Sequence, residues 1–143
     1  MILYCDTSAL VKLYISESHA REVKALVEEA EAVAVCRIAW AEYHAATARR
    51  AREVAADQDG MERARQSLAV DWGNYVVADV SQAVVERAGE YADAFALRGY
   101  DAVQLAAAAG VMELSGQDLT FACFDRRLNK AAGLLGMGVP FGL

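Results

Sequence analysis

The chain has 143 residues, of which 56% are hydrophobic and 24% charged, with a single proline. This length predicts one domain over residues 1–143, and the alanine-rich composition is typical of a helix-rich globular protein and excludes a disordered one. The formal net charge of −6 argues against a uniformly basic nucleic-acid-binding protein, but the basic residues occur in runs, so local positive surfaces remain.

The first part of the chain alternates strands and helices. Residues Ile2–Cys5 are apolar and predict a short buried strand, after which Asp6-Thr7-Ser8 can cap a helix. A second helix is expected over His19–Ala30. The apolar segment Ala32–Cys36 predicts a second buried strand.

The middle of the chain predicts a helical hairpin and a third strand. From Ile38 to about Asp57 the sequence is nearly unbroken alanine, arginine and glutamate, and Gly60 precedes a further helix that ends near Trp72. Residues Asn74–Ala78 then supply the third strand.

The last part begins with a helix that starts at Ser81. Apolar residues at offsets of four, seven and eleven form a stripe on this helix that we assign to the core: Val84, Ala88, Tyr91 and Phe95. After Gly99, an alanine-rich run through Ala109 predicts a tightly packed central helix, in which Gly110 is a weak point.

The remaining elements are short. Leu119–Phe124 predicts a fourth strand, Asp125 opens a short helix, and Val139-Pro140-Phe141 predicts a weak edge strand, where proline is tolerated. Alternating strands and helices imply right-handed crossovers. The expected fold is therefore an α/β protein, a three-layer α/β/α sandwich with a central, mainly parallel sheet.

Four acidic residues occur where the chain leaves a strand region for a helix: Asp6, Glu42, Asp101 and Asp125. Turns at the carboxyl ends of parallel strands converge on one crevice. Each acid could by itself be a helix cap. If they converge, however, two carboxylates about 5 Å apart repel by roughly 3 kcal/mol at an effective dielectric of about 20. The pattern thus favours a site for a hard divalent cation such as Mg²⁺.

Polar neighbours of these acids suit phosphate chemistry. Thr7 and Ser8 place hydroxyls beside Asp6, where they can hold its carboxylate or simply cap the turn. Arg126 and Arg127 fall in a first helical turn, where cations oppose the helix dipole, so their placement favours phosphate contact. Arg49 heads a further basic run.

Four segments resemble, in order and spacing, the four motifs of PIN-domain nucleases, and most closely those of VapC-type toxins of bacterial toxin–antitoxin pairs: Ile2–Lys12, Ile38–Glu42, Leu97–Ala106 and Phe124–Leu128. The resemblance implies a metal-dependent endoribonuclease with an antitoxin partner and commonly a homodimer. It matches Ser8 to a frequent hydroxyl position and the acidic positions to Asp6, Glu42, Asp101 and Asp125. Cys123 departs from the family, whose members often carry Thr or Ser there.

We therefore hypothesise that Asp6 and Asp101 hold Mg²⁺ or Mn²⁺ most directly. Glu42 and Asp125 would bind through water or complete a second metal position. Metal-activated water would then hydrolyse RNA phosphodiester bonds. The RNA backbone would be positioned by Arg126, Arg127 or Arg49.

Three alternatives remain open from the sequence. A catalytically silent PIN-like domain would bind RNA or protein without cutting. A receiver-type phosphoacceptor module would use Asp79 after the third strand, and a haloacid dehalogenase would need an acid where Ser8 stands.

The sequence gives no sign of export or membrane insertion. The apolar start runs directly into Asp6, and no stretch approaches about 18 uninterrupted apolar residues, so we expect a soluble cytoplasmic protein. The three widely spaced cysteines are expected to be reduced thiols, and the two histidines incidental.

Overall fold

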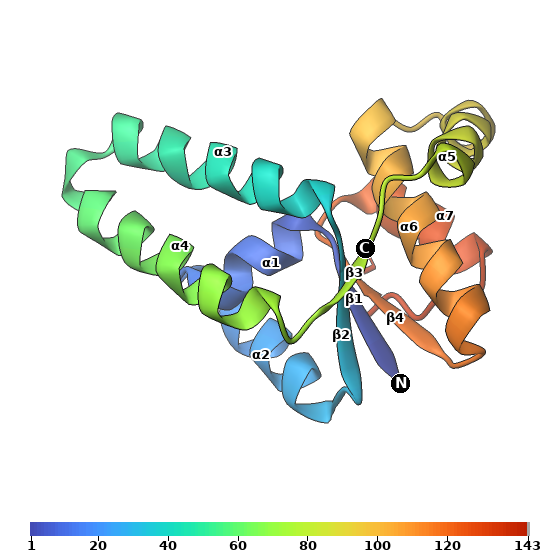
Figure 1. Cartoon of the computed structure of the whole chain (residues 1–143), viewed down its shortest axis with the longest axis horizontal. Coiled ribbons are helices and arrows are strands. Elements are labelled where there is room, and N and C mark those ends of the chain that lie inside the picture. Colours follow the sequence, from blue (N-terminus) through green and yellow to red (C-terminus); the bar gives the residue numbers. More distant parts are fainter. Residues whose placement is uncertain (143) are drawn as a thin grey trace.

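Four parallel strands form the centre of the computed structural model, which describes residues 1–142 (Figure 1). They are β1 (Ile2–Cys5), β2 (Ala32–Cys36), β3 (Val76–Ala78) and β4 (Leu119–Ala122), in the order β3-β2-β1-β4. In the register, Leu3 pairs with Val33 on one side and with Thr120 on the other. The two central strands, β1 and β2, are almost wholly buried, as expected for a parallel sheet covered on both faces.

Helices cover both faces of this sheet (Figure 1). On one side lie α1 (Thr7–Tyr14), α2 (Ala20–Glu29), α3 (Ile38–Glu53) and α4 (Gln58–Trp72), and on the other α5 (Gln82–Phe95), α6 (Gly99–Ser115) and α7 (Arg126–Leu134). Successive residues of β1 point to opposite faces, so Leu3 packs in one core and Tyr4 in the other. The predicted three-layer α/β/α sandwich is confirmed.

Helix α6 lies against the sheet because its buried face is built from small side chains. Ala102 and Ala106–Ala109 are almost inaccessible to solvent, and the helix contacts β2, β3 and β4. It continues through Gly110 without interruption. The apolar stripe of α5 packs beside it, with Ala88 buried and Tyr91 and Phe95 at the margin of the same core.

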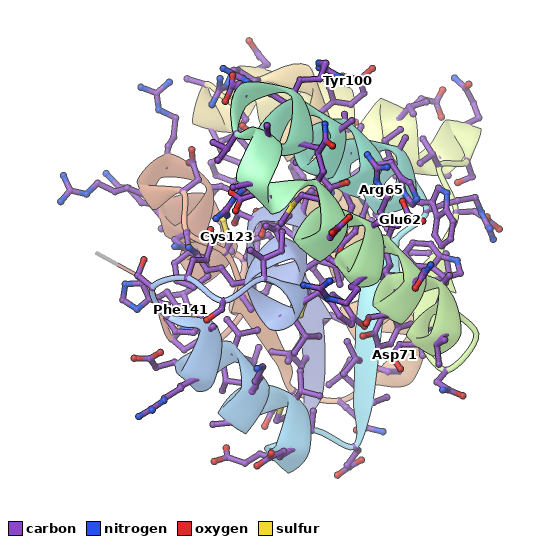
Figure 2. The ribbon with its side chains drawn as sticks, turned by 90° about the vertical axis from the view of Figure 1, so that its left-hand side faces the viewer. Glu62, Arg65, Asp71, Tyr100, Cys123 and Phe141 are labelled. Carbon is purple, nitrogen blue, oxygen red and sulfur yellow. The ribbon has the colours of Figure 1, made fainter. Side chains whose placement is uncertain are left out.

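Helices α3 and α4 form the predicted hairpin, which projects from the body of the molecule in Figure 1. A short 3₁₀ turn, η1 (Ala55–Asp57), joins them. The Tyr43 hydroxyl donates a hydrogen bond to the Ala64 carbonyl at 2.7 Å and ties the two helices together. Figure 2 views this side, with Glu62, Arg65 and Asp71 along α4.

The structure corrects the predictions at the sheet margins. Strands β3 and β4 are shorter than expected, because Asn74 and Tyr75 close a turn after α4 and β4 ends at Ala122. The predicted strand Val139-Pro140-Phe141 is wrong: Gly138 makes a single parallel bridge to Thr120, and the chain then turns, with the Gly142 amide donating to the Val139 carbonyl. Proline has no amide hydrogen with which to extend such a ladder.

Among residues 1–142, no helix combines the length and the apolar character needed to cross a bilayer.

Candidate active site

The four predicted acids line one hollow of about 310 Å³ at the carboxyl ends of the central strands. Asp6 follows β1, Glu42 lies in the second turn of α3 after β2, Asp101 in the first turn of α6, and Asp125 caps α7 after β4. Thr7, Ser8, Gln104 and Phe124 complete the wall. The fold brings these side chains together because β1 runs between β2 and β4.

Asp6 is the most buried of the four acids, with 5% of its surface exposed. Its Oδ1 atom accepts hydrogen bonds from the Ala9 amide at 3.0 Å, as an N-cap, and from the Ser8 hydroxyl at 2.7 Å. Burial raises the pKa of Asp6 to about 6, although these hydrogen bonds oppose the rise and nearby Asp101 adds to it. The charged form of Asp6 is therefore costly to hold here.

Ser8 also joins two parts of the site, because its Oγ accepts a hydrogen bond from the Phe124 amide at 3.1 Å. The exit of β1 is thereby fastened to the segment that follows β4.

Asp101 responds to the other acids around the hollow. Burial raises its pKa, and the charges of Asp125 and Glu42 raise it further, whereas Arg98 lowers it. The Arg98 Nε lies 3.5 Å from Asp101 Oδ2, but the Arg98 side chain is 86% exposed, so solvent screens this pair. Like charges are thus concentrated in the hollow.

Glu42 is held by two side chains from other elements. Its Oε1 accepts hydrogen bonds from the Thr7 hydroxyl at 2.7 Å and from Gln104 Nε2 at 2.9 Å. Thr7 therefore orients Glu42, whereas Ser8 orients Asp6. Gln104 is not among the predicted site residues, although it is the one polar residue of the apolar run 102–112 and lies one helical turn after Asp101.

Asp125 combines a capping role with its place in the hollow. Its Oδ1 accepts a hydrogen bond from the Leu128 amide at 2.9 Å. Cys123 Sγ accepts one from the Asp125 amide at 3.2 Å, and burial with nearby Asp6 raises the pKa of this thiol well above its ordinary value. Cys123, labelled in Figure 2, is thus a neutral buried group beside two acids.

The chemistry of this donor set fits a hard divalent cation. The side chains around the hollow offer four carboxylates and three further polar groups, with no lysine or arginine among them. In the described residues no three His, Cys, Asp or Glu side chains form a ready metal-binding group. Each carboxylate is instead engaged by a hydroxyl, an amide or Arg98.

A second, larger hollow of about 910 Å³ adjoins the first and shares Asp101 and Asp125 with it. We call it the cationic groove, because four basic side chains line it: Arg98, Arg126, Arg127 and Lys130. Its apolar lining includes Phe95 and Leu134. Within residues 1–142, Arg126 and Lys130 form no ion pair.

The other predicted substrate contacts have different surroundings. Arg127 Nη1 donates to the Ala96 carbonyl at 3.1 Å and so links α7 to the turn between α5 and α6, where Ala96 has a positive φ of 53°. Arg49 is not brought to either hollow: it is 72% exposed on α3 and pairs with Glu53 at 2.9 Å.

The geometry disfavours the rival phosphoacceptor sites. Asp79 follows the edge strand β3, is 68% exposed and is ion-paired with Arg37, outside the hollow. Ser8, and not an acid, stands two residues after Asp6. Neither histidine lines the acidic hollow.

Comparisons with known proteins show what this chain is similar to over most of its length. The model of the PIN domain family matches residues 3–134. Ribonuclease VapC45 and ribonuclease VapC49, from two strains of Mycobacterium tuberculosis, are each 33% identical over 138 residues, which are 96% of this chain and 94% of the relative. A toxin–antitoxin complex from Klebsiella pneumoniae contains a chain with the same fold, at a TM-score of 0.68, 21% identity and full coverage of both chains.

Proposed function

The chain belongs to the PIN-domain family as a VapC-type ribonuclease toxin, and from this premise we propose that the acidic hollow is the centre in which it hydrolyses RNA phosphodiester bonds. The observation that carries the proposal is the meeting of four carboxylates, from segments up to 119 positions apart, in one hollow beside a cationic groove. Their mutual repulsion has no obvious structural benefit, but it favours a divalent cation.

Mg²⁺ or Mn²⁺ is the proposed cofactor. Asp6 and Asp101 would hold it most directly, with Glu42 and Asp125 acting through water or at a second position. When bound, such a cation supplies a Lewis acid that makes water a stronger nucleophile and offsets charge on the phosphate. The chain keeps the acids in place through Ser8 on Asp6 and through Thr7 and Gln104 on Glu42.

The cationic groove is the proposed path of the RNA backbone. Arg126 and Lys130 are exposed cations on its wall, while Asp101 and Asp125 belong to both hollows. A phosphate in the groove would thus lie next to the acids, and its neighbours along the strand would contact the basic side chains. Arg127 would stabilise the wall of the groove and also contact the RNA backbone. Arg49 would at most contact a more distant phosphate.

Partners follow from the family. We propose a cognate antitoxin, because the structurally similar Klebsiella pneumoniae chain is from a toxin–antitoxin complex, and a homodimer that works in the cytoplasm. Co-purification with the product of any short reading frame beside its gene tests the first association, and light scattering of the purified protein tests the second.

The site assignment is tested with Asp101→Asn and Glu42→Gln. We expect RNA cleavage in Mg²⁺ or Mn²⁺ to fall by about 100-fold or more, since charge stabilisation at a reacting group is worth that much. In EDTA the melting temperature should stay near that of the parent or rise, because each change removes one of the mutually repelling charges. Asp79→Asn is the matched control, because it removes an exposed acid that also follows a strand.

Full RNA cleavage activity in both variants would contradict the assignment of the site. If the parent itself binds RNA in Ca²⁺ but cuts none in Mg²⁺ or Mn²⁺, across single-stranded and structured RNAs, the silent binding domain is the better description.

A further inference from the structure

A buried amide connects the sheet core to the acidic hollow. Gln104 on α6 is 2% exposed, and hydrogen bonds engage both ends of its side-chain amide. The Tyr4 hydroxyl donates to Gln104 Oε1 at 2.6 Å. Gln104 Nε2 donates to Glu42 Oε1 at 2.9 Å and to Thr7 Oγ1 at 3.1 Å. One side chain thus joins β1, α1 and α3.

The chemistry of these partners fixes the orientation of the amide. An ionised carboxylate can only accept hydrogen bonds, so the amide nitrogen must face Glu42 and the amide oxygen must face Tyr4. Tyr4 is fully buried and stacks on Phe121 with ring centroids 5.4 Å apart, which leaves its hydroxyl little freedom. A flipped amide would place an oxygen against the Glu42 carboxylate.

The hydrogen bonds on Glu42 are asymmetric. Thr7 and Gln104 both donate to Oε1, and within residues 1–142 no protein donor contacts Oε2. Glu42 is therefore held by one oxygen, while the other is left to bind a ligand. Mg²⁺ demands near-ideal octahedral geometry and is usually bound through one or two carboxylates together with several waters.

We propose that Gln104 is a positioning residue: anchored by Tyr4, it holds Glu42 Oε1 so that Glu42 Oε2 is the oxygen available to a divalent cation, through water or at a second position. The inference rests on the proposed function, because it assumes that Glu42 takes part in metal binding. In this role Gln104 acts through Glu42 and would not itself contact the cation or the RNA.

A purely structural role would look different. A buried amide that only stabilised α6 would affect the stability of the fold but not the affinity of the metal. Partners that orient metal ligands typically change metal affinity or activity by about 10- to 100-fold when they are removed.

The test is the affinity of the full chain for Mn²⁺ and Mg²⁺, measured by isothermal titration calorimetry without RNA. Gln104→Met keeps the volume and removes both donors, and we expect it to weaken binding on the order of 10-fold. Thr7→Val removes the other donor to Oε1 and is expected to act in the same direction. Tyr4→Phe removes only the hydroxyl that anchors Gln104 and is expected to weaken binding several-fold. It replaces Gln104→Met in the test if that variant does not fold.

Thr47→Val is the matched control. It removes a buried hydroxyl of α3 that donates to the Tyr43 carbonyl at 3.0 Å, without a bond to Glu42. We expect a lower melting temperature with unchanged metal affinity. The proposal is overturned if Gln104→Met, or Tyr4→Phe in its place, behaves like this control.

Glu42→Gln in the same titration separates the two proposals. If Glu42→Gln weakens binding and Gln104→Met does not, the positioning role fails and the site assignment stands. If Glu42→Gln also leaves the affinity unchanged, Glu42 is not a metal ligand, and its part in the proposed function fails as well.

Discussion

The acidic hollow and the α3–α4 hairpin differ in how their charged side chains are paired. In the hairpin, charged side chains pair with opposite charges, as in Arg49 with Glu53 at 2.9 Å and Arg50 with Asp57 at 3.0 Å. In the hollow, acids from distant segments face one another, and burial raises the pKa of Asp6 to about 6.

The difference supports the proposed function of the hollow. Charges that only stabilise a fold are arranged to attract each other, and exposed pairs contribute little even then. Buried like charges cost free energy, and perturbed carboxylates cluster at functional sites. Holding the acids together in the hollow therefore lowers the stability of the fold, whereas the ion pairs of the hairpin do not.

Removing divalent cations is expected to have the largest effect, because it leaves the carboxylates of the hollow without a counter-charge. In EDTA, RNA cleavage by the parent should fall to the level of the Asp101→Asn variant. Cleavage should return when Mg²⁺ or Mn²⁺ is added in excess. Added metal should raise the melting temperature of the parent, and should raise that of Asp101→Asn much less. An equal rise in melting temperature for both proteins would mean that the metal does not bind at the acids of the hollow.

The next effect is on stability and its dependence on pH. The pKa of Asp6 rises from an ordinary 3.8 to about 6 on folding, so the folded state holds a proton more tightly than the unfolded state. Folding is therefore favoured at low pH, and this contribution is lost as the pH rises from about 4 to above 6. A shift of about two pKa units corresponds to roughly 3 kcal/mol.

Asp6→Asn isolates that contribution. In EDTA, the variant should be as stable as the parent near pH 4 and more stable at pH 7.5, by an amount that approaches roughly 3 kcal/mol. Urea unfolding at several pH values measures the difference. A constant difference across this range would mean that Asp6 is not held at an electrostatic cost.

A smaller effect is expected in the cationic groove. Arg126→Ala should raise KM several-fold with little change in kcat, and it should lower the salt dependence of RNA binding by about one unit of slope, since one phosphate contact is lost. Arg52→Ala is the control, because it removes an exposed cation from the hairpin. Equal effects of the two variants would point to general electrostatic attraction and not to a groove.

The smallest effect is expected in the hairpin itself. Glu53→Ala removes the partner of Arg49 from an exposed pair whose side chains are 61% and 72% exposed. The melting temperature and the cleavage rate should stay within experimental error of the parent. A clear gain in RNA affinity or cleavage would mean that the freed Arg49 contacts a phosphate, and would restore it as a substrate contact.

Much of the fold could be predicted because its signals are local. Strands β1 and β2 were predicted at their observed bounds, since short apolar segments flanked by polar residues mark buried strands. Asp6 and Asp125 cap helices as expected, and Ser81, the predicted start of its helix, is the N-cap; each side chain accepts a hydrogen bond from the amide three residues ahead. The prediction for 139–141 failed because apolar character there serves packing, and the partner strand offers a single bridge.

The sequence by itself determined the order of the elements and the positions of the four acids, because periodicity, caps and strand ends are written in neighbouring residues. The tertiary structure decided which side chain holds which acid: Thr7 turned to Glu42 and not to Asp6, Gln104 joined them, and Arg127 bonded the Ala96 carbonyl. These contacts join residues 31 to 97 positions apart. Such pairs depend on how the layers pack, which no local pattern encodes.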